Sequence, residues 1–202
     1  MALIISLPDV DIDHAAQALR EGKILCIPTD TVYGLICSPF IESALHRLAD
    51  LKNRPRFKPF ALFVSDMPRL LRENVTPSER AERLTQRFWP GALTIVMAAE
   101  DDCPCAYGGT VGARSPNHPL AQALLTKCGG LLANTSLNRS GEPPARSLHD
   151  VGAFLENIDI AIDAGVLPPR PASTVVDCSQ SPIKILREGG ISAQAVWDCV
   201  NL

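Results

Sequence analysis

Hydroxyl and carboxylate side chains crowd into one short segment near the start of the chain. Thr29, Asp30, Thr31 and Tyr33 lie within five residues, directly after the apolar run 24–27. The proline that ends this run lacks a backbone donor and fixes φ, so a buried strand should stop there and leave the polar side chains at the edge of a sheet. Open α/β sheets bind small molecules at such edges. The segment therefore predicts a site for a small polar ligand, with a turn that satisfies only its own backbone as the alternative.

The densest positive charge in the sequence lies in the segment 52–59. Lys52, Arg54, Arg56 and Lys58 alternate there with other residues, and two prolines prevent a continued helix and stiffen the loop. Cations held in this way can neutralise phosphate groups. The alternative interpretation is a solvated loop whose cations are favoured near the C-terminus of the preceding helix.

A second polar segment, which we predict to be a turn, spans residues 134–141 and follows the predicted strand 131–133. Its hydroxyls and amides can cradle phosphate and ribose oxygens, as anion nests do. The segment lacks the GxxxxGK[ST] pattern of a P-loop and the GxGxxG pattern of a dinucleotide site. Two further predicted strands each end in an arginine, Arg114 and Arg187.

These residues favour chemistry that works by positioning and charge neutralisation. The chain has four histidines, and no Cys/His or Ser/His pair with a supporting carboxylate can be identified from spacing, which argues against a hydrolytic triad. Phosphoryl and nucleotidyl transfer need cations and hydrogen-bond donors more than a strong base. We therefore expect one cavity to be lined by Thr31, Arg54, Arg114, Ser136 and Arg187.

Short strands and helices that must position these side chains alternate along the chain. Apolar runs bounded by Pro, Gly and polar turns predict strands, and apolar residues at helical spacing predict helices. A chain of 202 residues with 46% hydrophobic side chains favours one domain, 1–202. The predicted strands are 2–7, 24–27, 60–64, 92–98, 111–114, 131–133, 158–162, 173–177 and 183–186. Helices are predicted at 12–20, at 41–51, from 118 to a stop at 129–130, and at 193–200. The region 67–88 is predicted to be amphipathic and interrupted, with a helix start at 76–79.

The composition argues against several classes of protein. A net charge of −3 is not that of a surface built throughout for nucleic acid, although it is compatible with a local basic patch. The seven cysteines are scattered, several of them in apolar runs, which indicates free thiols in a reducing cytoplasm. The one close pair, Cys103 and Cys105, has no matching Cys/His pair for a zinc site, so no metal-ligating residue is expected. No apolar run approaches the ~20 residues that span a bilayer, so no membrane partner is expected.

Seven motifs occur in the order and spacing of the YrdC/Sua5/TsaC family, and the chain resembles its short, single-domain form. The match covers nearly the whole chain, and the first two motifs are specific in combination with the fifth. The resemblance implies an α/β fold, a twisted, mixed β-sheet with surrounding helices and a large concave basic face. The motifs are PTDTVYGL at 28–35, KxRPxxKP at 52–59, WPGxLT at 89–94, RxP at 114–116, SxNxSG at 136–141, STVVD at 173–177 and RxG at 187–189.

The resemblance also implies an activity, that of an L-threonylcarbamoyladenylate synthase, which is a nucleotidyltransferase. Such an enzyme uses L-threonine, bicarbonate and ATP and releases pyrophosphate, and Mg²⁺ is expected to accompany the triphosphate. Downstream threonylcarbamoyl-transfer proteins use the product to form N6-threonylcarbamoyladenosine at position 37 of tRNA.

The expected site residues follow from these motifs and from Asn134, which stands where some relatives have threonine. Arg114 is expected to bind the threonine carboxylate through a forked pair, and Lys52 and Arg54 are expected to be the catalytic cations. The residues expected to bind threonine or bicarbonate are Thr31, Tyr33, Arg114 and Asn134. The residues expected to bind ATP are Lys52, Arg54, Lys58, Thr110, Ser136, Asn138, Ser140 and Arg187.

Two other functions stay open at this point. One is a module that binds double-stranded RNA or tRNA through the concave basic face, which would need cations but no threonine pocket. The other is a diverged paralogue that adenylates a different carbamate or carbamoyl group. Pyrophosphate release from ATP with bicarbonate and individual amino acids would separate the three functions.

Overall fold

The computed structural model describes residues 2–55 and 59–201. The described strands are β1 (Leu3–Ser6), β2 (Leu25–Ile27), β3 (Gly34–Cys37), β4 (Ala61–Val64), β5 (Val75–Thr76), β6 (Leu93–Ala99), β7 (Thr110–Arg114), β8 (Leu131–Ser136), β9 (Ile160–Asp163), β10 (Thr174–Asp177) and β11 (Lys184–Arg187). The described helices are α1 (Ile12–Arg20), α2 (Glu42–Leu51), α3 (Met67–Leu71), α4 (Glu79–Phe88), α5 (Pro119–Lys127) and α6 (Ala193–Val200), with two 3-10 segments, η1 (Leu7–Asp9) and η2 (Leu148–Asn157). Within the described ranges, no helix has the length and apolar character needed to cross a membrane.

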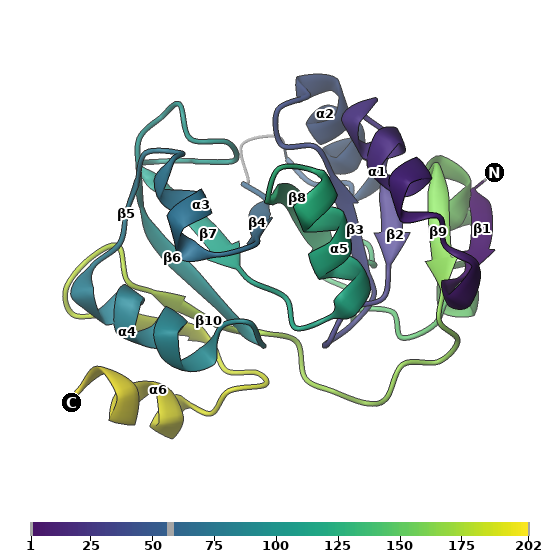
Figure 1. Cartoon of the computed structure of the whole chain (residues 1–202). Helices are drawn as coiled ribbons and strands as arrows, with labels where there is room; N and C mark the ends of the chain where they lie inside the picture. The colour runs from purple at the N-terminus through teal and green to yellow at the C-terminus, as the bar shows by residue number, and fades with distance from the viewer. Residues whose placement is uncertain (1, 56–58, 202) are drawn as a thin grey trace.

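All of these strands belong to one sheet. Their order is β1-β9-β2-β3-β8-β4-β7-β6-β10-β11, and β5 pairs with β6 off this path. Parallel pairs such as β4 with β7 adjoin antiparallel pairs such as β6 with β7, so the sheet is mixed, as the resemblance implied (Figure 1).

Most element boundaries follow the local sequence signals. The carboxylate of Asp11 caps α1 by accepting the backbone amides of Asp13 at 3.0 Å and His14 at 3.1 Å. The same helix ends just before Gly22, which has a φ of +80°. Ser78 caps α4 after the predicted break.

Several elements differ from the sequence-based predictions. β3 follows directly from the polar segment 29–33 and pairs antiparallel with both β2 and β8, whereas no strand was predicted there. β8 continues through Ser136, so the prediction of a turn at 134–136 is wrong. Polar runs are typical of turns, but here neighbouring strands satisfy the backbone while polar side chains face a cavity. The short strand β5 and the 3-10 segments η1 and η2 were also not predicted.

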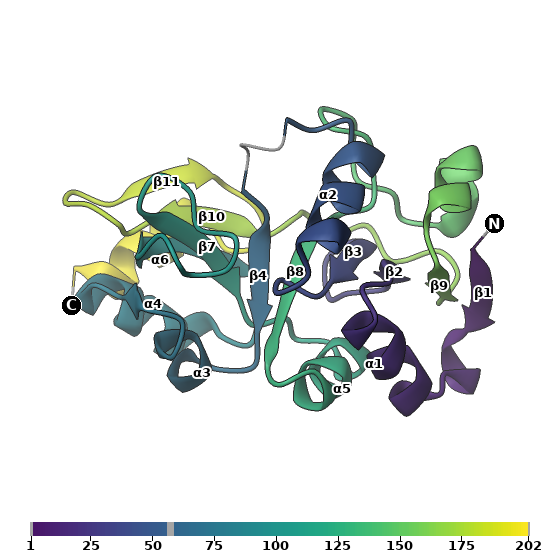
Figure 2. The ribbon, with the colours of Figure 1, turned by 90° about the horizontal axis from the view of Figure 1, so that it is seen from above.

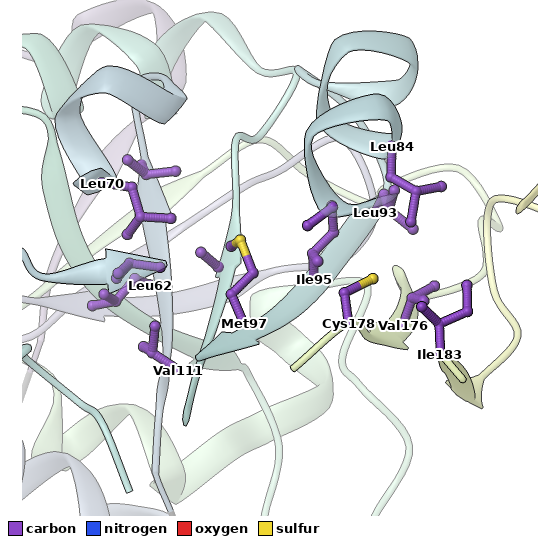
Figure 3. Packing of buried hydrophobic residues seen from close by; sticks show 14 of the residues in the cluster. Leu62, Leu70, Leu84, Leu93, Ile95, Met97, Val111, Val176, Cys178 and Ile183 are labelled. Carbon is purple, nitrogen blue, oxygen red and sulfur yellow. The ribbon is translucent and has the colours of Figure 1, made fainter. Parts of the chain in front are cut away.

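Helices cover the two halves of the sheet differently. Around β2 and β3, α1 and α5 pack on one face, and α2 with η2 packs on the other (Figure 2). Around β4, β6, β7 and β10, helices α3, α4 and α6 pack over one face, and Figure 3 shows the buried side chains beneath them. The opposite face of this second half contains the cavity described below.

The side chain of Thr174 ties the loop after β11 to β10. It is fully buried, and its Oγ1 donates to the carbonyl of Ile191 and accepts the amides of Gly189 at 2.9 Å and Ile191 at 3.0 Å. Gly189 lies so close to the neighbouring backbone that an added Cβ would be 2.1 Å from the carbonyl oxygen of Ala172, so only glycine fits. These contacts hold the end of β11, and Arg187 with it.

We expect Thr174→Val to lower the free energy of unfolding by about 2–4 kcal/mol, because it removes the partner of two amides and one carbonyl at nearly constant volume. Chemical denaturation should show a lower midpoint with an unchanged slope. Thr126→Val, at an exposed position of α5, is the matched control and should change stability by less than about 0.5 kcal/mol. Equal midpoints for Thr174→Val and the unaltered protein would contradict this role of the side chain.

Candidate functional site

A cavity of about 420 Å³ lies on the face of the sheet that α3, α4 and α6 leave uncovered. Its walls come from β4, β6, β7, β8, β10, the end of β11 and the segment that joins β2 to β3. The prediction that five residues from separate segments face one cavity is confirmed, while their chemical roles stay predictions. The expected site residues that line the cavity are Thr31, Tyr33, Arg54, Thr110, Arg114, Asn134, Ser136 and Arg187.

Strand geometry explains how these residues reach the cavity. Successive side chains of a strand point to opposite faces of the sheet. Along β7, Thr110, Gly112 and Arg114 line the cavity, whereas Val111 and Ala113 are buried in the core on the other face. One strand therefore serves both the core and the site.

Arg114 is the most firmly held cation of the cavity. Only 5% of its surface is exposed, and its guanidinium forms an ion pair with the carboxylate of Asp30. It also donates to Oγ1 of Thr31 at 3.0 Å and to the carbonyl of Gly91 at 2.8 Å. Burial lowers the pKa of Arg114, and the Asp30 carboxylate opposes this shift. The guanidinium is thereby fixed in one orientation at the inner wall.

Two further guanidinium groups lie at the cavity wall. Arg54 stacks over the ring of Phe60 at 5.2 Å and donates to the carbonyl of Pro59 at 2.6 Å. Its Nε is buried and has no hydrogen-bond partner among the described residues. Arg187 donates twice to the carbonyl of Ser173, at 2.8 and 3.1 Å. Burial lowers the pKa of both arginines.

Lys52 lies behind the cavity rather than in its lining. Only 3% of its surface is exposed, and its ammonium donates to the carbonyl of Ser136 at 2.6 Å and to Oδ1 of Asn138 at 2.5 Å. Burial, and then the charge of Arg54, lowers the pKa of Lys52 to about 8. The ammonium thus supports the polar segment that follows β8.

The other expected nucleotide residues of this region are also outside the lining. Asn138 accepts Oγ–H of Ser136 at 2.6 Å and donates to the carbonyl of Glu142, which shapes the turn. Ser140 is exposed, and its amide donates to the carbonyl of Lys52 at 3.2 Å. Lys58 lies outside the described residues.

Tyr33 and Asn134 differ in how their polar atoms are used. The Tyr33 hydroxyl donates to the carbonyl of Gly165 at 2.9 Å and accepts the amide of Ala164 at 2.8 Å, and burial raises its pKa to about 12. Tyr33 therefore anchors its segment through a hydroxyl that is already hydrogen-bonded. Nδ2 of Asn134 is buried without a partner in the described chain, which leaves a donor at the cavity wall.

Several residues near the site had no predicted role. Asp30 belongs to the first motif, but only the structure shows that it pairs with Arg114. Ser173 orients Arg187, and Phe63 lies below Arg114 with its ring 5.8 Å from the guanidinium carbon. His118 has a buried Nδ1 without a partner among the described residues, and burial lowers its pKa. A lone histidine before a proline carries no sequence signal for this position.

The chain is similar to proteins of known name over most of its length. It is 34% identical to the Threonylcarbamoyl-AMP synthase of Bacillus subtilis over 197 residues, which cover 95% of this chain and 57% of that protein. A crystal structure of P. abyssi Sua5 complexed with L-threonine superposes with a TM-score of 0.87 at 32% identity, covering 99% of this chain and 61% of that chain. The chain therefore spans little more than half the length of these two relatives.

A third protein is matched along its full length. The crystal structure of E. coli YciO has a TM-score of 0.83 at 25% identity and covers 97% of this chain and 100% of that chain. The sequence profile of the Sua5/YciO/YrdC family, described as telomere recombination, matches residues 17–189. This chain belongs to the Sua5/YciO/YrdC family.

Proposed function

We propose that this protein is an L-threonylcarbamoyladenylate synthase, which makes threonylcarbamoyl-AMP and pyrophosphate from L-threonine, bicarbonate and ATP. The observation that carries the proposal is the convergence of Arg54, Arg114 and Arg187 with the unpartnered amide of Asn134 on one cavity. The names of its relatives support the same activity. The product would serve proteins that transfer the threonylcarbamoyl group to adenosine 37 of tRNA.

The chemistry needs alignment and charge neutralisation more than a strong base. The threonine amine, with an ordinary pKa of about 8, loses a proton and forms a bond to the carbon of CO₂ derived from bicarbonate. An oxygen of the resulting carbamate then bonds to the α-phosphorus of ATP while the bond to pyrophosphate breaks. Both reactants are anions, so fixed cations lower the barrier by holding them together.

The geometry suggests a division of roles. Arg114 and Thr31 bind the carboxylate of threonine, and Asp30 keeps the guanidinium in place. Arg54 and Arg187 bind phosphate oxygens from two sides of the cavity. Lys52 shapes the Ser136–Asn138 turn and adds positive charge behind it. Lys58, Thr110 and Ser140 are further candidates for contacts with the nucleotide.

Mg²⁺ would accompany ATP rather than occupy a site built from side chains. Across residues 2–55 and 59–201, no group of three or more His, Cys, Asp or Glu residues is arranged to hold a metal ion. Phosphate oxygens and water are ligands that Mg²⁺ prefers. The cation would neutralise part of the triphosphate charge there.

The decisive experiment measures pyrophosphate release. The protein should release pyrophosphate from ATP when L-threonine and bicarbonate are both present, and omission of either should abolish the release. The proposal would be overturned if the protein released pyrophosphate with another amino acid in place of threonine, or if it bound RNA and released no pyrophosphate.

We expect Arg54→Ala to weaken the use of ATP roughly ten- to hundredfold, because a charge-assisted contact to phosphate is worth about 1.5–3 kcal/mol. Threonine binding should be unchanged. Arg87→Ala, which removes a cation from the surface of α4, is the matched control. An ATP affinity from calorimetry and a turnover rate that both lie within twofold of those of the unaltered protein would mean that Arg54 is only a surface cation.

We expect Asn134→Ala to lower the preference for threonine over valine while ATP affinity stays nearly unchanged. A pocket that only fits the shape separates such isosteres about 100-fold, whereas a hydrogen bond to the hydroxyl achieves more. The two amino acids are compared by pyrophosphate release at equal concentration. Asn157→Ala, at an exposed position outside the cavity, serves as the control. An unchanged ratio would show that Asn134 only shapes β8.

We expect ATP binding to take up protons at a pH about one unit above the Lys52 pKa, where the free protein has largely lost the ammonium proton. A bound triphosphate favours the charged form, so the pKa of Lys52 rises from about 8 toward its ordinary value of 10.5. Calorimetry in two buffers with different ionisation enthalpies measures the uptake. Lys52→Arg should abolish it, and Lys127→Arg should not. Equal uptake in both variants would contradict the assignment to Lys52.

A further inference from the structure

The strand β1 forms one edge of the sheet and is poorly covered on both of its faces. Among the described strands its one neighbour is β9, and Figure 1 and Figure 2 both show β1 at one end of the molecule. Leu3 and Ile4 are consecutive and so point to opposite faces of the sheet, yet 54% and 55% of their surfaces are exposed. An apolar strand with a free edge and two open faces is a surface on which another strand can pair.

The opposite edge of the sheet, β11, carries features that prevent pairing between molecules. Lys184 and Arg187 are exposed on β11, and its register with β10 shifts between Val175 and Val176, which marks a bulge. Charged side chains and bulges are devices by which proteins protect exposed edges. The segment 2–7, ALIISL, contains no charged residue, proline or glycine. The edge strand β1 thus lacks the protection that β11 has.

The backbone of β1 determines which residue can bond to a further strand. The amide of Leu3 donates to the carbonyl of Asp159 at 2.9 Å, on the side of β9. Backbone groups of successive residues point to opposite edges of a strand, so the amide and the carbonyl of Ile4 point away from β9. Two opposed residues of an antiparallel pair can exchange both hydrogen bonds when each presents these groups to the other. Ile4 meets this condition.

The side chains of β1 restrict the register of such a pair. Ile5 packs against the apolar cluster that contains Leu19 of α1. Alternation along the strand places Leu3 on this same face and puts Ile4 and Ser6 on the other. Directly opposed residues of an antiparallel pair point to the same face. With a two-fold axis perpendicular to the sheet, Ile4 can therefore oppose Ile4 or Ser6 of a second copy.

We propose that β1 pairs antiparallel with β1 of a second copy of this chain, with Ile4 opposite Ile4 and Leu3 opposite Ile5. Each of these opposed pairs is apolar on both sides. The other register would place Ile4 against Ser6 and would bring Leu3 to Leu7, where β1 has ended and η1 begins. A second copy is the favoured occupant because the two-fold axis through Ile4 matches the segment with itself. The segment also offers no charge by which a different partner could be recognised.

The dimer is weak and leaves the cavity open. A pair of four-residue strands buries less than the roughly 1,200–2,000 Å² of stable interfaces, so association depends on protein concentration. β9 and β2 lie between β1 and the strands whose residues line the cavity. Pyrophosphate release per chain should therefore be the same in monomer and dimer. The inference is independent of the proposed function.

The first test introduces charge at the two-fold axis. Sedimentation of the unaltered protein over a roughly hundredfold range of concentration should show a shift from monomer to dimer. Ile4→Lys alone and Ile4→Glu alone should stay monomeric, because like charges directly opposite one another destabilise a strand pair. An equimolar mixture of the two variants should restore the dimer. Leu186→Lys, which places the same charge at an exposed position of β11, is the matched control and should dimerise like the unaltered protein.

The second test measures the register and does not depend on the folding of the charged variants. In a hydrogen-bonded antiparallel pair the Cα atoms lie about 5.5 Å apart, a distance that a disulfide spans. Oxidised glutathione, which takes up the two electrons and two protons of the thiols, should cross-link Ile4→Cys into a dimer. Ser6→Cys, which does not oppose itself in this register, should cross-link no more than the unaltered protein with its own cysteines.

Three results would overturn the inference. They are an unaltered protein that is monomeric at every concentration, a dimer that Ile4→Lys leaves intact, and equal cross-linking of Ile4→Cys and Ser6→Cys. Pyrophosphate release measured on the same preparations tests the proposed function separately.

Discussion

The buried ion pair between Arg114 and Asp30 is the interaction on which the cavity depends. Both side chains are almost removed from solvent, with 6% and 10% of their side-chain surface exposed. A buried charge without its partner is strongly destabilising, so β7 and the segment between β2 and β3 must come together before either charge is tolerated. The carbonyl of Gly91 and the hydroxyl of Thr31 accept further hydrogen bonds from the guanidinium of Arg114. The pair therefore joins the two halves of the sheet at the inner wall of the site.

The same sheet supplies both stability and a polar surface. Successive side chains of β7 point to opposite faces, so Val111 and Ala113 lie in the core. Thr110, Gly112 and Arg114 lie on the other face and form the floor of the cavity. In the half of the sheet that contains β4, β6, β7 and β10, helices on one face bury the apolar surface that orders the strands, and hydrophobic burial is the main favourable contribution to folding. The other face can then carry groups that would be costly in a core. Gly112 is a clear case, because glycine weakens a strand interior yet opens the floor.

Local sequence signals predicted much of the fold, since caps, prolines and apolar periodicity act within a few residues. They failed at the end of β8, where polar residues typical of turns continue as a strand because their backbones pair with neighbours distant in sequence. They also missed β3, a buried strand of four residues that follows a polar segment and pairs with both β2 and β8. The site showed a similar limit. Motif spacing indicated that Lys52 and Tyr33 belong to the region, but their polar atoms bind Ser136, Asn138 and the 164–165 backbone instead of facing the cavity. Tertiary partners alone decide where a long side chain points.

The hydrogen-bond partners of the arginines that line the cavity explain why the cavity suits a polyanion. Arg54, Arg114 and Arg187 each donate to a backbone carbonyl, at Pro59, Gly91 and Ser173. A carbonyl restrains a guanidinium without neutralising it, whereas a carboxylate cancels its charge. The carboxylate of Asp30 cancels the charge of Arg114 in this way. No Asp or Glu is among the described residues that line the cavity, so the cavity keeps a net positive charge. The side-chain ordering that ligand binding would otherwise require is already complete in the fold, and the full electrostatic attraction remains for the phosphates.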